Sequence, residues 1–130
     1  MIPCSNRIQE ILEWVNGECI ADIGCDHAYV VCNAILNHQS KKGYACDVAQ
    51  GPLDNAKKTI EENHLSDFVS CRLLDGIQGL ESDVDQIIIC GMGGKLICYS
   101  PMLYMNNQLF AKILCAPRNA SWHPLLGRKP

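Results

Sequence analysis

Apolar residues near the start of the chain repeat with the spacing of an amphipathic helix. Each lies three or four positions from the next, so together they occupy one face of a helix. Ser5 is suited to cap the beginning of this helix and Gly17 to end it. Further helices are predicted over about 28–37 and from Gly51-Pro52 to about Asn63, since proline is tolerated in a first turn. The apolar positions of the first helix are Ile8, Ile11, Leu12 and Val15.

Short apolar runs alternate with these helices. The run Ile87-Ile88-Ile89-Cys90 shows no polar alternation, which is typical of a parallel strand buried on both faces. Strands are predicted at 19–23, 43–46, 68–73, 84–90 and 111–115, with another helix beginning near Lys95. This alternation predicts an α/β fold, a doubly wound and mostly parallel sheet of about five strands with helices on both faces.

Length and composition limit the class of protein. The 130 residues are enough for one domain, and 48% apolar with 19% charged residues is the balance of a globular core. No run approaches the roughly 20 apolar residues of a membrane span, and the N-terminus lacks a secretory pattern. The formal charge of −3 argues against a protein that binds a nucleic-acid backbone through one broad basic surface.

The chain has nine cysteines, and no two of them form a C-x-x-C pair. Structural zinc sites usually take two ligands from one tight turn, so a metal site is not expected. Several of the cysteines lie inside apolar runs, where a thiol behaves as a small hydrophobic group. We therefore expect reduced core cysteines, no bound metal and a cytoplasmic protein.

The residues able to carry chemistry follow the predicted strands. After the first strand comes Asp22-Ile23-Gly24-Cys25-Asp26-His27, where a glycine allows close approach of a ligand and a helix N-terminus favours negative charge. This segment is not the G-x-G-x-x-G dinucleotide fingerprint. Taken alone, it reads more readily as a strand-to-helix turn with a capping aspartate.

Three more segments occupy equivalent positions. Asp47 ends the second strand, where an acid can accept hydrogen bonds from both hydroxyls of a ribose. Asp75-Gly76 follows the third strand and can meet an adenine amino group, and Gly91-Met92-Gly93-Gly94 follows the fourth. Each could instead be a plain loop or turn. Because carboxyl ends of parallel strands share one edge of a sheet, the four segments together outline an adenosine-shaped site.

Three further side chains are candidates near this site. His27 and Tyr29 follow the first turn and are expected to face the same crevice, although a lone histidine is often structural. Arg7 precedes the first strand and can reach a carboxylate, with a solvated arginine as the alternative.

These motifs resemble one family, the bacterial tRNA (adenine(22)-N(1))-methyltransferases, which use S-adenosylmethionine to methylate adenine 22 of certain tRNAs. The D-I-G-x-D-H-A-Y segment of residues 22–29, paired with Gly91-Met92-Gly93-Gly94, carries the resemblance, supported by Asp47 and by Asp75-Gly76. The resemblance implies a Rossmann-like fold, S-adenosyl-L-methionine as the cofactor and tRNA as the partner.

The resemblance also assigns roles to residues. It implies that Asp22, Gly24, Cys25, Asp26 and His27 surround the amino-acid end of the cofactor, and that Asp47 takes the ribose hydroxyls. It implies that Asp75 and Gly76 bind the adenine. It also implies that the transferring methyl group is bordered by Gly91, Met92 and Gly93. We further assign Asp26 and Tyr29 to holding the base as catalytic residues, and Arg7 to the substrate.

The chain departs from the family towards its end. Cys115-Ala116-Pro117-Arg118 stands where the family has a Gln-Pro pair, and family members continue with two more strands and a helical C-terminal domain. We therefore expect an incomplete cofactor-binding domain over 1–118 and an irregular tail over 119–130. The fifth strand would then be an unpaired edge, which predicts self-association.

Two other functions fit parts of the pattern. One is a truncated, non-catalytic S-adenosylmethionine-binding module that keeps the crevice but lacks contacts to RNA. The other is a nicotinamide-dependent oxidoreductase on a similar sheet, against which the missing G-x-G-x-x-G argues. Methyl transfer to tRNA separates the enzyme from the module.

Overall fold

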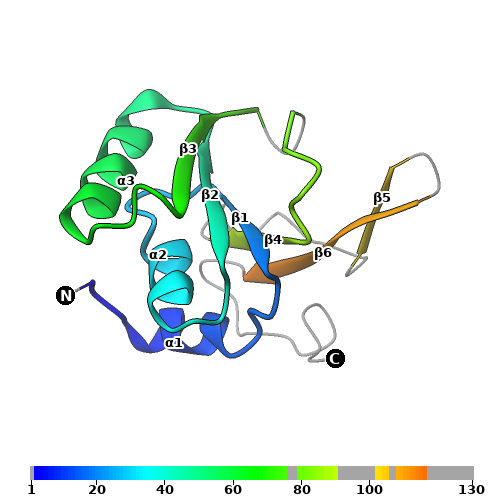
Figure 1. Cartoon of the computed structure of the whole chain (residues 1–130), viewed down its shortest axis with the longest axis horizontal. Coiled ribbons are helices and arrows are strands. Elements are labelled where there is room, and N and C mark those ends of the chain that lie inside the picture. Colours follow the sequence, from blue (N-terminus) through cyan, green and yellow to red (C-terminus); the bar gives the residue numbers. More distant parts are fainter. Residues whose placement is uncertain (1, 76–78, 91–101, 106–107, 117–130) are drawn as a thin grey trace.

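One mixed sheet organises the chain. The computed structural model describes residues 2–75, 79–90, 102–105 and 108–116, with side chains described as far as Ile89. Within these ranges six strands lie in the order β3-β2-β1-β4-β6-β5 (Figure 1). All neighbours pair in parallel except β5 and β6, which are antiparallel. The strands are β1 (Cys19–Ile23), β2 (Lys42–Asp47), β3 (Val69–Leu73), β4 (Gln86–Cys90), β5 (Met102–Met105) and β6 (Gln108–Ala116).

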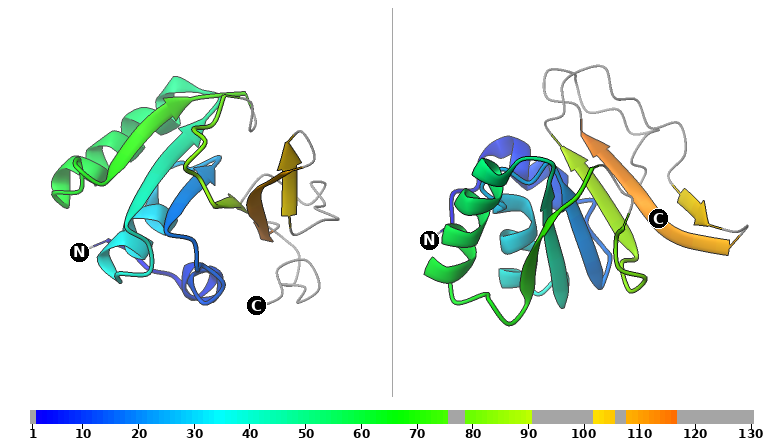
Figure 2. Two further views of the ribbon diagram at one scale, coloured as in Figure 1. Left: turned by 45° about the vertical axis from the view of Figure 1, so that its right-hand side comes forward. Right: turned by 90° about the horizontal axis from the view of Figure 1, so that it is seen from above.

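The three helices described are α1 (Asn6–Leu12), α2 (Tyr29–Leu36) and α3 (Gln50–Glu62), and they lie together on one face of the sheet (Figure 2). Ser5 caps α1 as predicted, its hydroxyl accepting a hydrogen bond from the Ile8 N–H at 3.2 Å. The predicted positions of these helices are therefore confirmed to within a few residues, apart from the end of α1. The helix expected near Lys95 falls outside the described residues.

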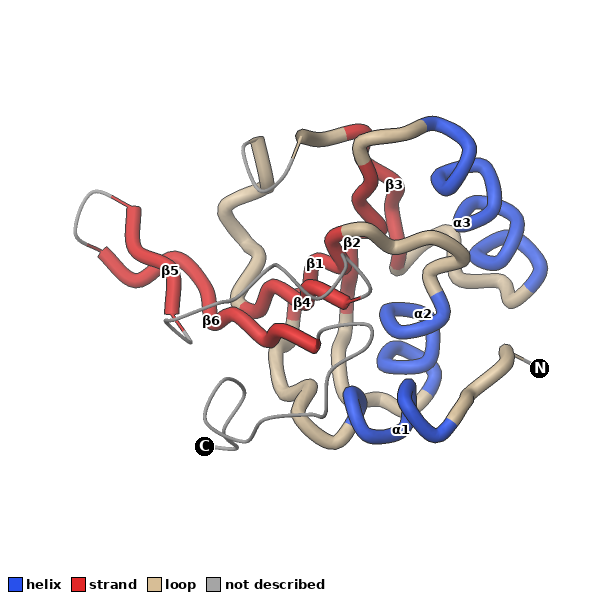
Figure 3. Tube along the Cα trace, turned by 180° about the vertical axis from the view of Figure 1, so that it is seen from behind, coloured by secondary structure: helices blue, strands red, loops and turns tan. Residues whose placement is uncertain are grey.

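Both faces of the central strands are buried, as the unbroken apolar run predicted. Ile20 and Ile88 point into the core beneath the helices, whereas Ala21 and Ile87 point into a second core on the opposite face. All four side chains are 0% exposed. Val84 belongs to this second core, and Leu74 and Leu80 pack against it. Figure 3 shows the described stretches between β3 and β4 on the side of the sheet away from the helices.

The expected unpaired edge at the fifth strand is wrong. That strand is β6, which is longer than the predicted 111–115 and pairs with β4 on one side and β5 on the other. The sequence analysis missed β5, because a four-residue strand after Pro101 is too short to give a periodic signal. Among the described strands the sheet edges are therefore β3 and β5.

The helix predicted to run to Gly17 ends earlier, at Leu12. Side chains from distant parts of the chain hold the backbone that follows it. The Gln39 side-chain amide donates to the carbonyls of Leu12 and Val15, at 2.7 and 3.2 Å. Gln86 binds the next residues of the turn and ties them to the start of β4. These contacts replace the hydrogen bonds that a further helical turn would make.

Gly43 allows β2 to approach α2 closely, and its replacement tests this packing. A Cβ at Gly43 would collide with Cγ2 of Val31, which is itself 0% exposed and unable to move aside. We expect Gly43→Ala to lower the free energy of unfolding by about 1–3 kcal/mol, the usual cost of overpacking a core. Urea denaturation measures the change.

Gly51 provides the matched control. It lies in the first turn of α3, and nothing stands within 4 Å of a Cβ placed there. Gly51→Ala should be neutral or stabilise by up to about 1 kcal/mol, because alanine is the better helix former. Equal effects of the two substitutions would contradict the proposed close packing of β2 on α2.

Candidate functional site

The predicted site is built where β1 and β2 end side by side. Ile23 of β1 lies opposite Cys46 of β2 in the parallel register. The backbone N–H groups of Gly24 and Cys25 both donate to the carbonyl of Cys46, at 2.9 and 3.0 Å. These two hydrogen bonds bring the loop after β1 next to Asp47, so the structure joins the first two predicted motifs in one site.

The loop between β1 and α2 has an unusual backbone. Gly24, Asp26 and Ala28 have positive φ angles of 73°, 49° and 61°. Glycine adopts this region freely, whereas alanine does so at a cost of roughly 1–2 kcal/mol. Ala28 is 0% exposed and is held in place by the core around it. Strained backbone of this kind is often found at binding and catalytic sites.

Asp22 is a buried carboxyl group at the end of β1. It is 2% exposed, and it accepts a hydrogen bond from the backbone N–H of Val31 in the first turn of α2. The N-cap of α2 is Ala28, which makes no side-chain cap hydrogen bond, so Asp22 binds the start of the helix without being its N-cap residue. Burial raises the pKa of Asp22 to about 7, and the nearby charge of Asp47 acts in the same direction.

Asp47 is half-buried at the end of β2, next to the loop. Its Oδ1 accepts a hydrogen bond from the Ala49 N–H at 3.1 Å, which fixes the entry into α3. The sequence analysis missed two apolar neighbours. Val48 is 66% exposed and Leu73, at the end of the adjacent strand, is 58% exposed. Their signal in the sequence is an apolar residue at or beside the end of a strand.

Two aromatic rings flank the loop. The rings of His27 and Tyr29 stack with centroids 5.2 Å apart and planes inclined by 13°. The carboxylate of Asp26 lies 3.9 Å from Nε2 of His27, and both side chains are largely exposed. The structure therefore brings these three candidates together on the outer side of the loop.

Of the remaining candidates, only Arg7 and Asp75 are described. Arg7 is a half-buried residue in the first turn of α1, and Asp75 is exposed just after β3. Gly76, Gly91, Met92 and Gly93 lie outside the described residues.

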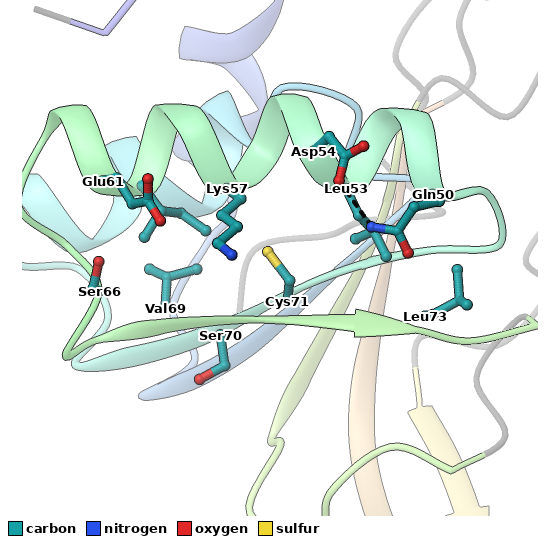
Figure 4. Close-up of a pocket in the computed structure, with 11 residues that line it drawn as sticks. Gln50, Leu53, Asp54, Lys57, Glu61, Ser66, Val69, Ser70, Cys71 and Leu73 are labelled. Carbon is teal, nitrogen blue, oxygen red and sulfur yellow. Dashed lines mark hydrogen bonds between the residues drawn. The ribbon is translucent and has the colours of Figure 1, made fainter.

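A hollow that the sequence did not predict lies between α3 and β3 (Figure 4). It has a volume of about 580 Å³, and Gln50 and Leu73 place one end of it near Asp47. Figure 4 shows the amino group of Lys57 pointing towards the sulfur of Cys71 inside it. Lys57 lowers the pKa of Cys71, but burial outweighs this effect and the pKa is raised overall. The other lining residues are Leu53, Asp54, Ile60, Glu61, Ser66, Val69 and Ser70.

The thiols near the site are unreactive. Burial raises the pKa of Cys32 and Cys46 to about 12 and also raises that of Cys25, so all three are neutral at physiological pH. Every cysteine whose side chain is described is a free thiol. Within the described part of the chain no group of three or more His, Cys, Asp or Glu side chains is arranged to hold a metal ion. None of the described helices is long and apolar enough to cross a membrane.

Comparison with known proteins agrees with this geometry. Residues 4–117 match the family model described as a methyltransferase domain. Over 100 residues, 75% of this chain, the sequence is 40% identical to the tRNA (adenine(22)-N(1))-methyltransferase of Bacillus subtilis (strain 168). The match covers 42% of that relative, so the chain spans less than half of its length.

Solved structures show the same relationship. The B. subtilis M1A22 tRNA methyltransferase TrmK has a TM-score of 0.67 and 38% identity, over 72% of this chain and 41% of that one. M. capricolum TrmK, in complex with S-adenosyl-homocysteine, has a TM-score of 0.64 and 32% identity, over 72% and 43%. A protein in the NADB-Rossmann superfamily from Streptococcus agalactiae has a TM-score of 0.66 and 33% identity, over 71% and 42%.

The predicted Rossmann-like α/β fold is thus confirmed by the sheet of this chain and by its neighbours. The family model extends from before α1 to the end of β6 and so takes in every described strand. The loop after β1 and the acid after β2 lie within that match. On this combination of sequence match and fold, the chain belongs to the methyltransferase domain family.

Proposed function

We propose that this protein transfers a methyl group from S-adenosyl-L-methionine to N1 of an adenine in tRNA, at position 22. One observation carries the proposal: the loop after β1 is hydrogen-bonded to the end of β2 beside Asp47. That arrangement supports a site for an adenosine compound with a charged amino-acid end. The names of the B. subtilis and M. capricolum relatives support the choice of cofactor and of tRNA.

The residues present suit the cofactor. The half-buried carboxylate of Asp47 is fitted to accept two ribose hydroxyls, and exposed Val48 and Leu73 offer apolar contact to an adenine beside it. In this proposal Asp75 and Gly76 complete the adenine site, and Gly91, Met92 and Gly93 border the methyl group. The strained loop holds the amino-acid end through Asp22, Gly24, Cys25, Asp26 and His27.

The chemistry asked of the protein is mainly positioning. When bound, S-adenosylmethionine supplies an electrophilic methyl group. Neutral adenine carries a lone pair and no proton at N1, so the attack requires alignment rather than a general base. We assign this alignment to Asp26 and Tyr29, and contact with the tRNA to Arg7. The stacked His27 ring supports Tyr29 in this role.

The proposal also covers the location, the domain boundary and the association of the protein. We place the protein in the cytoplasm and set the domain boundary near residue 118. Self-association through a sheet edge stays a prediction, with β3 or β5 in place of the edge first expected. Size-exclusion chromatography over a range of concentrations tests it, and a concentration-independent monomer would contradict it.

Methyl transfer from labelled S-adenosylmethionine to bacterial tRNA tests the function. We expect label at N1 of adenine 22. Tyr29→Phe keeps the ring against His27 and removes only the hydroxyl, whereas Asp26→Asn removes only a charge. Each should slow transfer by about 10²-fold if it misplaces the base. Binding of the cofactor without transfer to any tRNA would identify the non-catalytic module instead, and absence of binding would overturn both readings.

A further inference from the structure

Asp22 has surroundings that are unusual for a carboxylate. It is 2% exposed, and it accepts a hydrogen bond from a neutral donor, the backbone N–H of Val31. The salt bridges found within the described residues involve neither Asp22 nor Asp47. A buried carboxylate without a cationic partner is costly, so these surroundings favour the neutral form of Asp22.

The titratable groups that act on Asp22 come from the elements packed around it. Cys46 and Asp47 belong to β2, Cys32 to α2, and Cys25 to the loop between β1 and α2. The three thiols are uncharged near neutral pH, as described above. Asp47 is the charged member of this set, and its negative charge also opposes ionisation of Asp22.

We propose that Asp22 is protonated in the ligand-free protein and releases its proton when the ammonium group at the amino-acid end of S-adenosylmethionine binds beside it. This inference rests on the proposed function, since it requires that cofactor. The proton leaves the Asp22 carboxyl group for the solvent, and the resulting carboxylate faces the ligand's ammonium group. No other bond is formed or broken. Asp22 is thus a positioning residue that gains its charge only in the complex.

The inference predicts a direction and a size for the pH dependence. With the pKa of Asp22 near 7 in the ligand-free protein, most molecules carry the proton at pH 6 and about half carry it at pH 7. An ammonium group that binds beside Asp22 favours the carboxylate, so the proton is lost on binding and the affinity rises with pH. From pH 6 to pH 7 the affinity should increase about fivefold. Well above pH 7 Asp22 is already ionised in the ligand-free protein, so the affinity should stop rising.

Calorimetry counts the proton directly. The whole chain is titrated with S-adenosylhomocysteine, which carries the same ammonium group, in phosphate and in imidazole buffer at equal ionic strength. The difference in binding enthalpy between buffers gives the number of protons released. We expect about 0.9 per ligand at pH 6 and about 0.5 at pH 7.

Variants assign the proton to a residue. Asp22→Asn keeps an acceptor for the Val31 N–H but has no proton to lose, so its release should fall to nearly zero and its affinity should stop varying between pH 6 and pH 7. Asp67→Asn makes the same chemical change at an exposed position on another loop and should behave as the parent chain. His27→Gln changes a different side chain of the same loop and serves as a second comparison. Release that persists in Asp22→Asn and disappears in His27→Gln would overturn the proposal.

The number of protons released by the unsubstituted chain tests the proposal even if Asp22→Asn does not fold. Tight binding with no proton released at pH 6 would reject the role of Asp22 and leave the proposed cofactor intact. Absence of binding at every pH would reject the proposed function and, with it, this inference.

Discussion

Asp47→Ala is expected to weaken binding of S-adenosylhomocysteine by about 5- to 150-fold, the equivalent of about 1–3 kcal/mol. The carboxylate of Asp47 stands at the end of β2, beside the loop that Gly24 and Cys25 attach to the same strand. In the proposed complex it accepts charge-assisted hydrogen bonds from two ribose hydroxyls. Removing it leaves those hydroxyls with no ionic partner in a partly desolvated site. Isothermal titration calorimetry at pH 7 measures the loss.

Asp47 also holds the start of α3, so the experiment needs a variant that separates the two roles. Asp47→Asn keeps an oxygen that accepts from the Ala49 N–H but carries no charge. It should lose part of the affinity while keeping the unfolding midpoint of the parent chain. If Asp47→Ala binds the ligand as tightly as the parent, Asp47 is not the ribose residue.

Gln86→Ala is expected to lower the free energy of unfolding by about 3 kcal/mol. Gln86 is 4% exposed at the start of β4, and its side chain spans the turn between α1 and β1. Its Oε1 accepts from the N–H groups of Asn16 and Gly17, both at 2.9 Å, and its amide donates to the Trp14 carbonyl at 3.1 Å. Truncation leaves three backbone groups without these partners, at least one of them buried. Urea denaturation followed by circular dichroism measures the change.

Gln50→Ala is the matched control for this substitution. Gln50 is exposed on α3, where its side chain donates to Asp54 at 2.9 Å. The same truncation there should change stability by no more than about 0.5 kcal/mol. A Gln86→Ala variant as stable as the Gln50→Ala variant would show that water replaces the lost hydrogen bonds and that the turn does not depend on Gln86.

Local patterns located most of the secondary structure. The unbroken run Ile87-Ile88-Ile89 predicted a strand buried on both faces, and Ile87 and Ile88 are both 0% exposed. Ser5 predicted a helix cap that is present. The strand predicted over 19–23 has the same bounds in the structure. These signals are encoded in the spacing of residues within one segment, so they can be found without knowing what the segment packs against.

The candidate site could be predicted only in part from the spacing of residues within single segments. Asp47 and the loop after β1 were found because both follow predicted strands, and parallel strands bring their carboxyl ends to one edge. Exposed Val48 and Leu73 were missed, because exposure of an apolar side chain depends on what lies over it. The hollow between α3 and β3 was missed for the same reason.

The sequence by itself determined the alternation of strands and helices, the acids and glycines at the strand ends, and the family resemblance. Tertiary structure decided that α1 ends at Leu12, because the backbone after it bonds to Gln39 and Gln86, residues far along the chain. It also decided that β6 pairs with β5 and so is not an edge strand. Tertiary structure likewise decided the raised pKa of Asp22. A carboxyl group loses its hydrating water, and its pKa rises, only when surrounding elements bury it.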